Sequence, residues 1–278
     1  MTKFKPMVSA AIACLCLGNI GSASAADLTL CHIANAGFFA EASGQAVVID
    51  AVLKRDDYDG SFALPSAQTL QTLQNGTHTF SNVKLALVSH LHGDHFDAKA
   101  TLHHLKSNPK VAYVMPSSAY DLLIAAGLPE AHKDRVHAIM PDEENSPKKL
   151  EINGISLTIF RIDHGPNMPQ NLGYKVTLAG KTVFHTGDIN ASAEQLSAAG
   201  LSNTATDIML MPFWYVLQQT ETIKKAWDIK TMVPMHYHAK EQPWMARLGG
   251  PEGLRTATAA LWPTALRIDK EMQCETIK

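Results

Sequence analysis

The sequence lacks several features that would assign it to a protein class at once. Its 278 residues include 24 Lys and Arg against 26 Asp and Glu, so it lacks the basic excess of a dedicated nucleic-acid-binding protein. It also lacks repeats and low-complexity segments. With 46% hydrophobic and 18% charged residues, it is not a disordered, collagen-like or coiled-coil chain. The length allows one large domain or two small ones.

Several sequence motifs are missing too. The chain has no Gly-rich loop of the P-loop or dinucleotide type. Ser89 does not lie in a nucleophile elbow, which disfavours a Ser-His-Asp hydrolase. Beyond the first 25 residues, no apolar run is long enough to cross a bilayer. The abundant functional residue is instead histidine, which occurs 13 times.

Residues 1–25 are predicted to be a secretory signal peptide. Lys3 and Lys5 precede an apolar run over residues 7–17, and the small residues at 23–25 suit a signal peptidase that cuts before residue 26. A buried N-terminal helix is the alternative, and the glycines in this segment argue against it. We therefore expect an exported protein, periplasmic or secreted, with a single domain over residues 26–278.

Two of the four cysteines would remain after cleavage, Cys31 and Cys274, near opposite ends of the mature chain. In an oxidising compartment they could form a disulfide that joins the two ends. Two unpaired thiols are the alternative. The choice depends on the distance between the Cα atoms, which a sequence does not report.

Hydrophobic patterning predicts a set of early strands, followed by strands that alternate with helices. Strands are predicted at 28–33, 38–41, 46–49, 83–88, 111–115, 208–211 and 231–235, with hairpins across 151–162 and 174–184. Helices are predicted at 98–105, 116–127, 193–199, 217–227 and 253–261, and a serine after Pro116 is a candidate cap for the second of them. This order suits sheets with helices on their outer faces.

The densest group of potential metal ligands is the motif SHLHGDH at residues 89–95, directly after a predicted strand. His90 and His92 are two residues apart, so on a strand end or loop their side chains point the same way. Asp94 and His95 follow Gly93, where the chain can turn sharply. Four imidazole or carboxylate groups within six residues form a dense ligand set for a metal ion such as zinc.

Three further candidate ligands each come just after an apolar strand. They are His164, Asp188 and His236. Functional side chains collect at such positions because a rigid sheet presents the loops that follow its strands. We therefore group these three residues with the histidine motif.

These motifs, in this order, resemble the metallo-β-lactamase-fold hydrolases. The resemblance rests on SHLHGDH, on His164, on HTGD at Asp188, on VPMHY at His236 and on VVIDAVL at Asp50, and it covers residues 27–270. It is closest to the branch that includes glyoxalase II and the ascorbate-6-phosphate lactonase-like proteins. It implies an α/β fold, a four-layer αββα sandwich with the metal site at one edge of the two sheets.

The resemblance also implies a role for each matching residue. The implied ligands are His90, His92 and His164 for one metal ion and Asp94, His95 and His236 for a second, with Asp188 bridging both. Asp50 would support the motif loop instead of binding metal. At Asn35 the chain departs from the family pattern, because relatives often carry a histidine there.

The donor chemistry suits zinc independently of the resemblance. Five imidazoles and two carboxylates form a nitrogen and oxygen site that Zn²⁺ accepts, although iron or manganese would also fit. The set contains no thiolate, which suits an oxidising compartment. With two metal ions bound, a hydroxide at the metals is expected to attack a lactone, ester, amide or phosphoester. Asp94 is expected to orient that group or accept its proton.

Three alternatives share this fold: a mononuclear iron thiol or persulfide dioxygenase, a true β-lactamase, and a non-catalytic metal-binding protein. Nucleic-acid processing is disfavoured, because only 47 residues separate Asp188 from His236 and the net charge is −2. RNA-cleaving relatives insert a further domain in that interval. The expected partner is therefore a small-molecule substrate, with no membrane span once the signal is removed. The substrate's identity and the oligomeric state stay open.

The other polar and aromatic residues are expected outside the ligand set. His185 and His238 are interpreted as neighbours of the ligands, and His103 and His104 as surface residues of a helix. The segment Phe-Trp-Tyr at 213–215 is equally compatible with lining a substrate pocket and with packing under the last helix.

Overall fold

The computed structural model describes residue 1 and residues 26–55, 57–139, 147–201, 204–262 and 264–278. Apart from Met1, the predicted signal peptide lies outside the described residues, so export stays a prediction. Within the described part of the chain, no helix is both long and apolar enough to span a bilayer.

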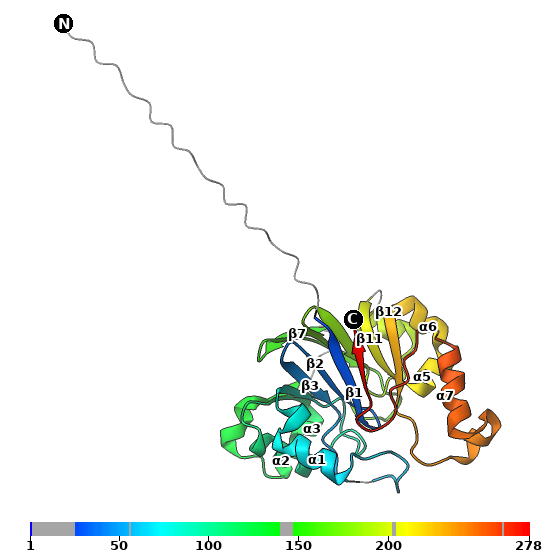
Figure 1. The fold of residues 1–278 in the computed structure, drawn as a ribbon, viewed down its shortest axis with the longest axis horizontal. Coiled ribbons are helices and arrows are strands. Elements are labelled where there is room, and N and C mark those ends of the chain that lie inside the picture. Colours follow the sequence, from blue (N-terminus) through cyan, green and yellow to red (C-terminus); the bar gives the residue numbers. More distant parts are fainter. Residues whose placement is uncertain (2–25, 56, 140–146, 202–203, 263) are drawn as a thin grey trace.

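Two β-sheets lie at the centre of the described fold (Figure 1). The first has the strand order β13-β1-β2-β3-β4-β5-β6, and the second has the order β12-β11-β10-β9-β8-β7. The strands of the first sheet are β1 (Leu28–Ala34), β2 (Gly37–Ala42), β3 (Gln45–Ile49), β4 (Val83–Leu87), β5 (Ala112–Pro116), β6 (Val136–Ile139) and β13 (Cys274–Ile277). The strands of the second are β7 (Lys148–Ile152), β8 (Ile155–Ile162), β9 (Asn171–Leu178), β10 (Lys181–His185), β11 (Thr204–Pro212) and β12 (Trp227–Met235).

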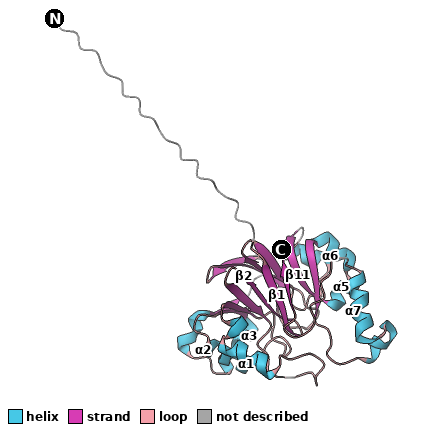
Figure 2. Ribbon diagram, in the orientation of Figure 1, coloured by secondary structure: helices cyan, strands magenta, loops and turns pink. Residues whose placement is uncertain are grey.

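Helices lie on the outer sides of the sheet pair (Figure 2). Beside the first sheet lie α1 (Ala67–Asn75), α2 (Ala98–Ser107) and α3 (Ser117–Ala125), and beside the second lie α4 (Ala193–Ala198), α5 (Phe213–Gln218), α6 (Thr220–Ala226) and α7 (Gly250–Ala260). Short 3₁₀ helices are η1 (His78–Phe80), η2 (Glu130–Arg135) and η3 (Pro243–Leu248). The predicted α/β fold, a four-layer αββα sandwich, is confirmed.

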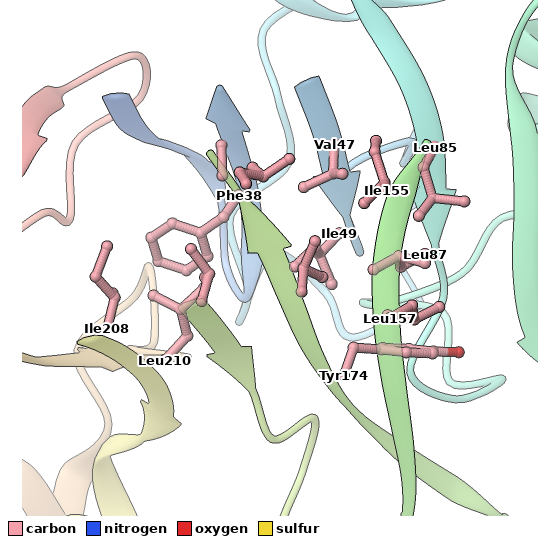
Figure 3. Packing of buried hydrophobic residues seen from close by; sticks show 14 of the residues in the cluster. Phe38, Val47, Ile49, Leu85, Leu87, Ile155, Leu157, Tyr174, Ile208 and Leu210 are labelled. Carbon is pink, nitrogen blue, oxygen red and sulfur yellow. The ribbon is translucent and has the colours of Figure 1, made fainter. Parts of the chain in front are cut away.

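Three apolar clusters hold the four layers together. Figure 3 shows part of the central one, in which Phe38 and Leu85 of the first sheet face Leu157 and Leu210 of the second. A second cluster lies between the first sheet and α1–α3, and a third between the second sheet and α4–α6. Because both faces of each sheet are covered, many of the strands are buried along most of their length.

The hairpin between β7 and β8 forms as its sequence predicts. Asn153 and Gly154 have φ angles of 52° and 75°, which a tight turn of this type requires and which these two residues adopt most easily. Lys148 pairs with Ile159 and Ile152 with Ile155, so the turn sets the register of the whole hairpin.

Cys31 and Cys274 form a disulfide, which decides between the two alternatives. The two residues face each other in the antiparallel pair β1–β13, where their Cα atoms are 4.0 Å apart. The bond therefore joins the first and last strands of the described fold.

Three local predictions were wrong. The helix expected over 217–227 is two helices, α5 and α6, separated at Gln219, and Trp227 already begins β12, with its side chain buried. The serines expected to cap α3 do not cap it, because the helix begins after Pro116, which makes no side-chain cap. His104 was expected at the surface but lies on the buried side of α2, with its Nδ1 2.5 Å from the hydroxyl oxygen of Tyr113. His103, its neighbour, is exposed as predicted.

Candidate metal centre

The histidine motif forms a compact loop between β4 and α2. The N–H groups of His95 and Phe96 both donate to the carbonyl oxygen of His92, at 3.0 and 2.8 Å, which turns the chain back on itself. A Cβ atom on Gly93 would lie 2.0 Å from a side-chain oxygen of Asp57, so a larger residue would require that side chain to move. Asp97 then caps α2 by accepting from two backbone N–H groups.

The second sheet anchors the start of this loop. The hydroxyl group of Tyr174, on β9, donates to the carbonyl oxygen of Val88 at 2.6 Å. The N–H of Leu172, on the same strand, donates to the carbonyl oxygen of Ser89 at 2.9 Å. These two bonds hold the motif loop against the strand edge from which the remaining candidate ligands come.

The structure brings all seven candidate ligands together in two adjacent groups. The first group is His90, His92, His164 and Asp188, and the second is Asp94, His95 and His236. Within each group, one nitrogen or carboxylate oxygen per residue lies within 4.8 Å of the others. Residues separated by up to 146 positions in the sequence thus meet at one edge of the sheet pair.

The Asp188 carboxylate lies between the two groups. Its Oδ2 is 3.8 Å from His90 Nε2, 3.5 Å from His164 Nε2 and 3.4 Å from His236 Nε2. Its Oδ1 is 3.3 Å from His95 Nε2. This is the position that a carboxylate shared by two metal ions would need.

Asp50 holds the motif loop through hydrogen bonds to Ser89 and His95. Its Oδ1 accepts the backbone N–H of Ser89 at 2.7 Å, and its Oδ2 accepts the Ser89 hydroxyl at 2.5 Å and the Nδ1–H of His95 at 2.8 Å. Because Nδ1 of His95 is bonded to Asp50, Nε2 is the ring nitrogen that faces the centre. Such a carboxylate–histidine pair is the usual support of a metal-binding imidazole.

The loop that carries Asp188 is held by two residues that sequence reasoning did not single out for this task. Asn171 accepts the N–H of Asp188 at 3.1 Å and donates to the carbonyl oxygen of Thr186 at 3.0 Å. His185 Nδ1 accepts the N–H of Gly187 at 3.0 Å. His185 is therefore a neighbour of the ligands, as expected, and it also shapes their loop.

Asn35 takes part in the centre despite its departure from the family pattern. Its side-chain amide donates to Asp94 twice, to the backbone carbonyl at 3.2 Å and to Oδ2 at 3.1 Å. His236 Nε2 lies 3.0 Å from the same Oδ2. Asp94 is therefore oriented from two sides.

Aromatic rings border the centre on the His236 side. The ring of Phe62 lies edge-on to His236 at 4.7 Å between centroids and is stacked on His238 at 5.0 Å. Trp214 lies edge-on to His236 at 4.8 Å. Phe62 comes from the loop after β3, for which the sequence carries no motif that would have identified it.

Segment 213–215 was compatible with lining a substrate pocket and with packing under the last helix, and its residues differ in this respect. Trp214 contacts the centre, whereas Phe213 is buried in a small cluster with Met245 and Leu254. Tyr215 is also buried, and its hydroxyl donates to the carbonyl oxygen of Ala191 at 2.7 Å.

Nearby carboxylates raise the pKa values of the two histidines in the second ligand group. Burial alone would lower the pKa of His236, but Asp188 and Asp94 outweigh it and raise that pKa to about 9. The pKa of His95 is likewise raised, because the same two carboxylates outweigh its burial. Burial favours the neutral form of Asp188, yet His236 and His95 hold its pKa well below the usual range. His90, by contrast, has a lowered pKa, chiefly through burial and the neighbouring charge of His95.

The arrangement fits a metal ion at the second group. His95 Nε2 faces the centre, and the oxygens Asp188 Oδ1 and Asp94 Oδ2 lie 3.3 and 3.6 Å from it. Asp188 Oδ1 is buried without a hydrogen-bond partner among the described residues. Converging acceptors repel one another unless a proton or a cation lies between them, and this donor set is one that zinc prefers.

Comparisons with known proteins agree with this geometry. Residues 45–241 match the family model described as the beta-lactamase superfamily domain. A protein of Saccharolobus solfataricus named as a metal-dependent hydrolase is 32% identical over 108 residues, which are 39% of this chain and 44% of that protein. The alignment thus spans less than half the length of this relative.

Solved structures share the fold. A metallo hydrolase from Ignicoccus hospitalis superimposes with a TM-score of 0.58 at 16% identity, over 91% of this chain and 99% of that one. A metallo-beta-lactamase fold protein from Bacillus subtilis superimposes with a TM-score of 0.61 at 13% identity, over 91% and 100%.

Proposed function

Because this chain belongs to the beta-lactamase superfamily, we propose that it is a metal-dependent hydrolase that holds two zinc ions at the candidate metal centre. The observation that carries this proposal is the place of Asp188, whose two oxygens reach both ligand groups at 3.3 to 3.8 Å. A single metal ion would use Asp188 together with only one ligand group, whereas here the two carboxylate oxygens face both groups. A bridging carboxylate also favours the glyoxalase II and lactonase-like branch over a true β-lactamase.

The seven candidate ligands would hold the metal ions as the sequence predicts. His90, His92 and His164 would hold the first, and Asp94, His95 and His236 the second. Bound zinc ions would lower the pKa of a coordinated water toward neutrality and stabilise negative charge on a substrate oxygen. This chemistry suits a lactone, ester, amide or phosphoester.

The protein's own residues would prepare the site for that reaction. Asp50 keeps the hydrogen of His95 on Nδ1, so that Nε2 is free to bind. Asn35 orients the Asp94 carboxylate toward the centre, where it would bind metal and orient or deprotonate the attacking water. Phe62 and Trp214 would contact an uncharged, apolar part of the substrate.

We also propose that the protein is exported to the periplasm or secreted. The signal-like pattern of residues 1–25 supports this, and so does the disulfide between Cys31 and Cys274. Disulfides persist in oxidising compartments and are rare in the cytosol.

The first experiment is to measure the metal content of the purified mature protein by inductively coupled plasma mass spectrometry. We expect about two zinc ions per chain, as a dinuclear site requires. A panel of lactone, ester, amide, β-lactam and phosphodiester substrates would then identify the reaction. About one iron per chain would overturn the proposal and favour the thiol or persulfide dioxygenase. Two zinc ions without turnover on any substrate class would favour a metal-binding protein.

A further inference from the structure

A row of three rings continues outward from the candidate metal centre. Phe62, which lies edge-on to His236, is stacked on His238 at 5.0 Å between ring centroids. His238 in turn lies edge-on to Trp244 at 5.9 Å. Phe62 and His238 are half-buried, whereas Trp244 is 36% exposed. We call Phe62, His238 and Trp244 the aromatic row, which leads from a candidate ligand to the protein surface.

Trp244, at the outer end of the row, is held in place by buried rings. It is stacked on Phe213, with 6.1 Å between the centroids and 13° between the ring planes, and Phe213 is 5% exposed. Phe213 is also stacked on Tyr237 at 5.3 Å and packs with Met245, the neighbour of Trp244 in η3. The Arg255 guanidinium lies 5.0 Å from the centroid of Tyr237. A tryptophan that is fixed in this way loses little conformational freedom when a ligand packs against it.

The two segments that carry the row are joined to each other. Phe62 belongs to the loop after β3, whereas His238 and Trp244 follow β12. The N–H of Ala239 donates to the carbonyl oxygen of Ser61 at 2.8 Å, directly beside the stacked pair of Phe62 and His238. The row is therefore a fixed part of the fold at this side of the centre.

The chemistry of the row indicates what it would bind. Its three rings present flat, largely apolar faces, which pack best against another planar, apolar group. Ligand sites are commonly lined by such side chains next to a few polar groups, here the candidate ligands. A short acyl group held at His236 would reach the first ring at most, whereas a group of one or two aromatic rings would extend along the row to Trp244.

We propose that Trp244 is a specificity-determining residue, which packs against a planar, apolar group of one or two aromatic rings joined to the bond that is hydrolysed. This inference deepens the proposed hydrolase function and rests on it. The row takes no part in breaking the bond. It favours substrates that carry such a group over substrates of the same bond type with a short aliphatic group.

The test measures binding of two carboxylates that resemble reaction products, naphthylacetate and acetate, to the zinc-loaded mature chain by isothermal titration calorimetry. Both offer the same group to the metals, and only naphthylacetate offers rings to the row. We expect naphthylacetate to bind at least about tenfold more tightly than acetate. Trp244→Ala should weaken naphthylacetate about three- to tenfold, the size of one aromatic contact, and leave acetate unchanged.

The matched control is Leu248→Ala, which removes an apolar side chain of similar exposure, 38%, from the same 3₁₀ helix. It should leave both affinities unchanged. Trp244→Phe should keep most of the affinity for naphthylacetate, and Trp244→Leu should keep less, because leucine has no planar face.

Equal affinities of the wild type and Trp244→Ala for naphthylacetate would overturn the inference, and so would a loss that acetate shares. Recovery by leucine as complete as that by phenylalanine would contradict the planar group. Because binding needs no turnover, these results are distinguishable from a failure of the proposed function, which would appear as zinc-loaded protein that hydrolyses no substrate class.

Discussion

Two buried histidines of this molecule have pKa values that are shifted in opposite directions. His95, in the candidate metal centre, is 1% exposed, and His104, on the buried side of α2, is 0% exposed. Asp188 and Asp94 raise the pKa of His95 despite its burial, whereas His104 faces Tyr113 and its burial lowers its pKa to about 4. The comparison shows that burial alone does not distinguish a candidate ligand from a core histidine. For His95, the neighbouring carboxylates make the difference.

The largest effect is expected when the Asp188 carboxylate, which distinguishes the surroundings of His95 from those of His104, is removed. Asp188→Ala deletes the carboxylate that reaches both sets of histidines, so we expect incomplete metal loading and a fall in kcat/KM of roughly a thousandfold, about 4 kcal/mol. Steady-state kinetics and metal analysis on the same sample would measure both. Asp121→Ala, at an exposed position of α3, is the control. A variant that keeps full turnover would rule out the bridge.

The second test uses the pH dependence of stability. The pKa of His104 is about 4 in the folded protein and near 6.5 when unfolded, so the unfolded state binds the proton first as the pH falls. The stability present above pH 6.5 should therefore decrease between pH 6.5 and 4, by about 3 kcal/mol from this group. Urea unfolding of the wild type and of His104→Gln at both ends of that range would isolate it. Parallel pH profiles for the two proteins would contradict the assignment.

A third prediction concerns Asp50, the carboxylate that holds the ring of His95. Asp50→Ala removes the acceptor that fixes the ring of His95, and the expected loss is about ten- to a hundredfold in zinc affinity. Competition with a zinc chelator would measure it. Asp207→Ala is a suitable control, because that carboxylate accepts bonds from Thr182 and Lys230 on the second sheet but contacts no candidate ligand. Equal affinities for the two variants would argue against the support role.

The smallest effect is expected for the aromatic contact. Phe62→Ala removes a ring from His236 and His238 without removing a charge. We expect KM for an apolar ester to rise roughly fivefold, about 1 kcal/mol, with little change in kcat. Phe62→Leu should recover part of the loss, since it restores apolar surface. A large fall in kcat would instead assign Phe62 to the chemical step.

The sequence predicts the contiguous part of this site better than the dispersed part. SHLHGDH places four groups on one loop, and three further candidate ligands could be found because each follows an apolar strand. Asn171 and Phe62 could not, because their roles depend on which segments meet in space. Burial of His104 was missed for the same reason, since the covering residue Tyr113 lies on another element.

The prediction of secondary structure also fails where an element depends on contacts between distant segments. The Asn153-Gly154 turn is local and was predicted correctly, whereas β13 was not predicted at all. That strand is short and mostly exposed, and it exists through its pairing with β1. Helices α5 and α6 were predicted as one, because their break at Gln219 and the burial of Trp227 depend on the packing of the second sheet.

Cys31 and Cys274 are 243 positions apart, and their disulfide converts the chain between them into a covalent ring. A single proteolytic cut in a surface loop of that ring would open it without releasing a fragment. The nicked protein would migrate as one species on a denaturing gel until a reductant separated its two pieces. New chain ends could likewise be created in such a loop, because β1 and β13 are already held side by side.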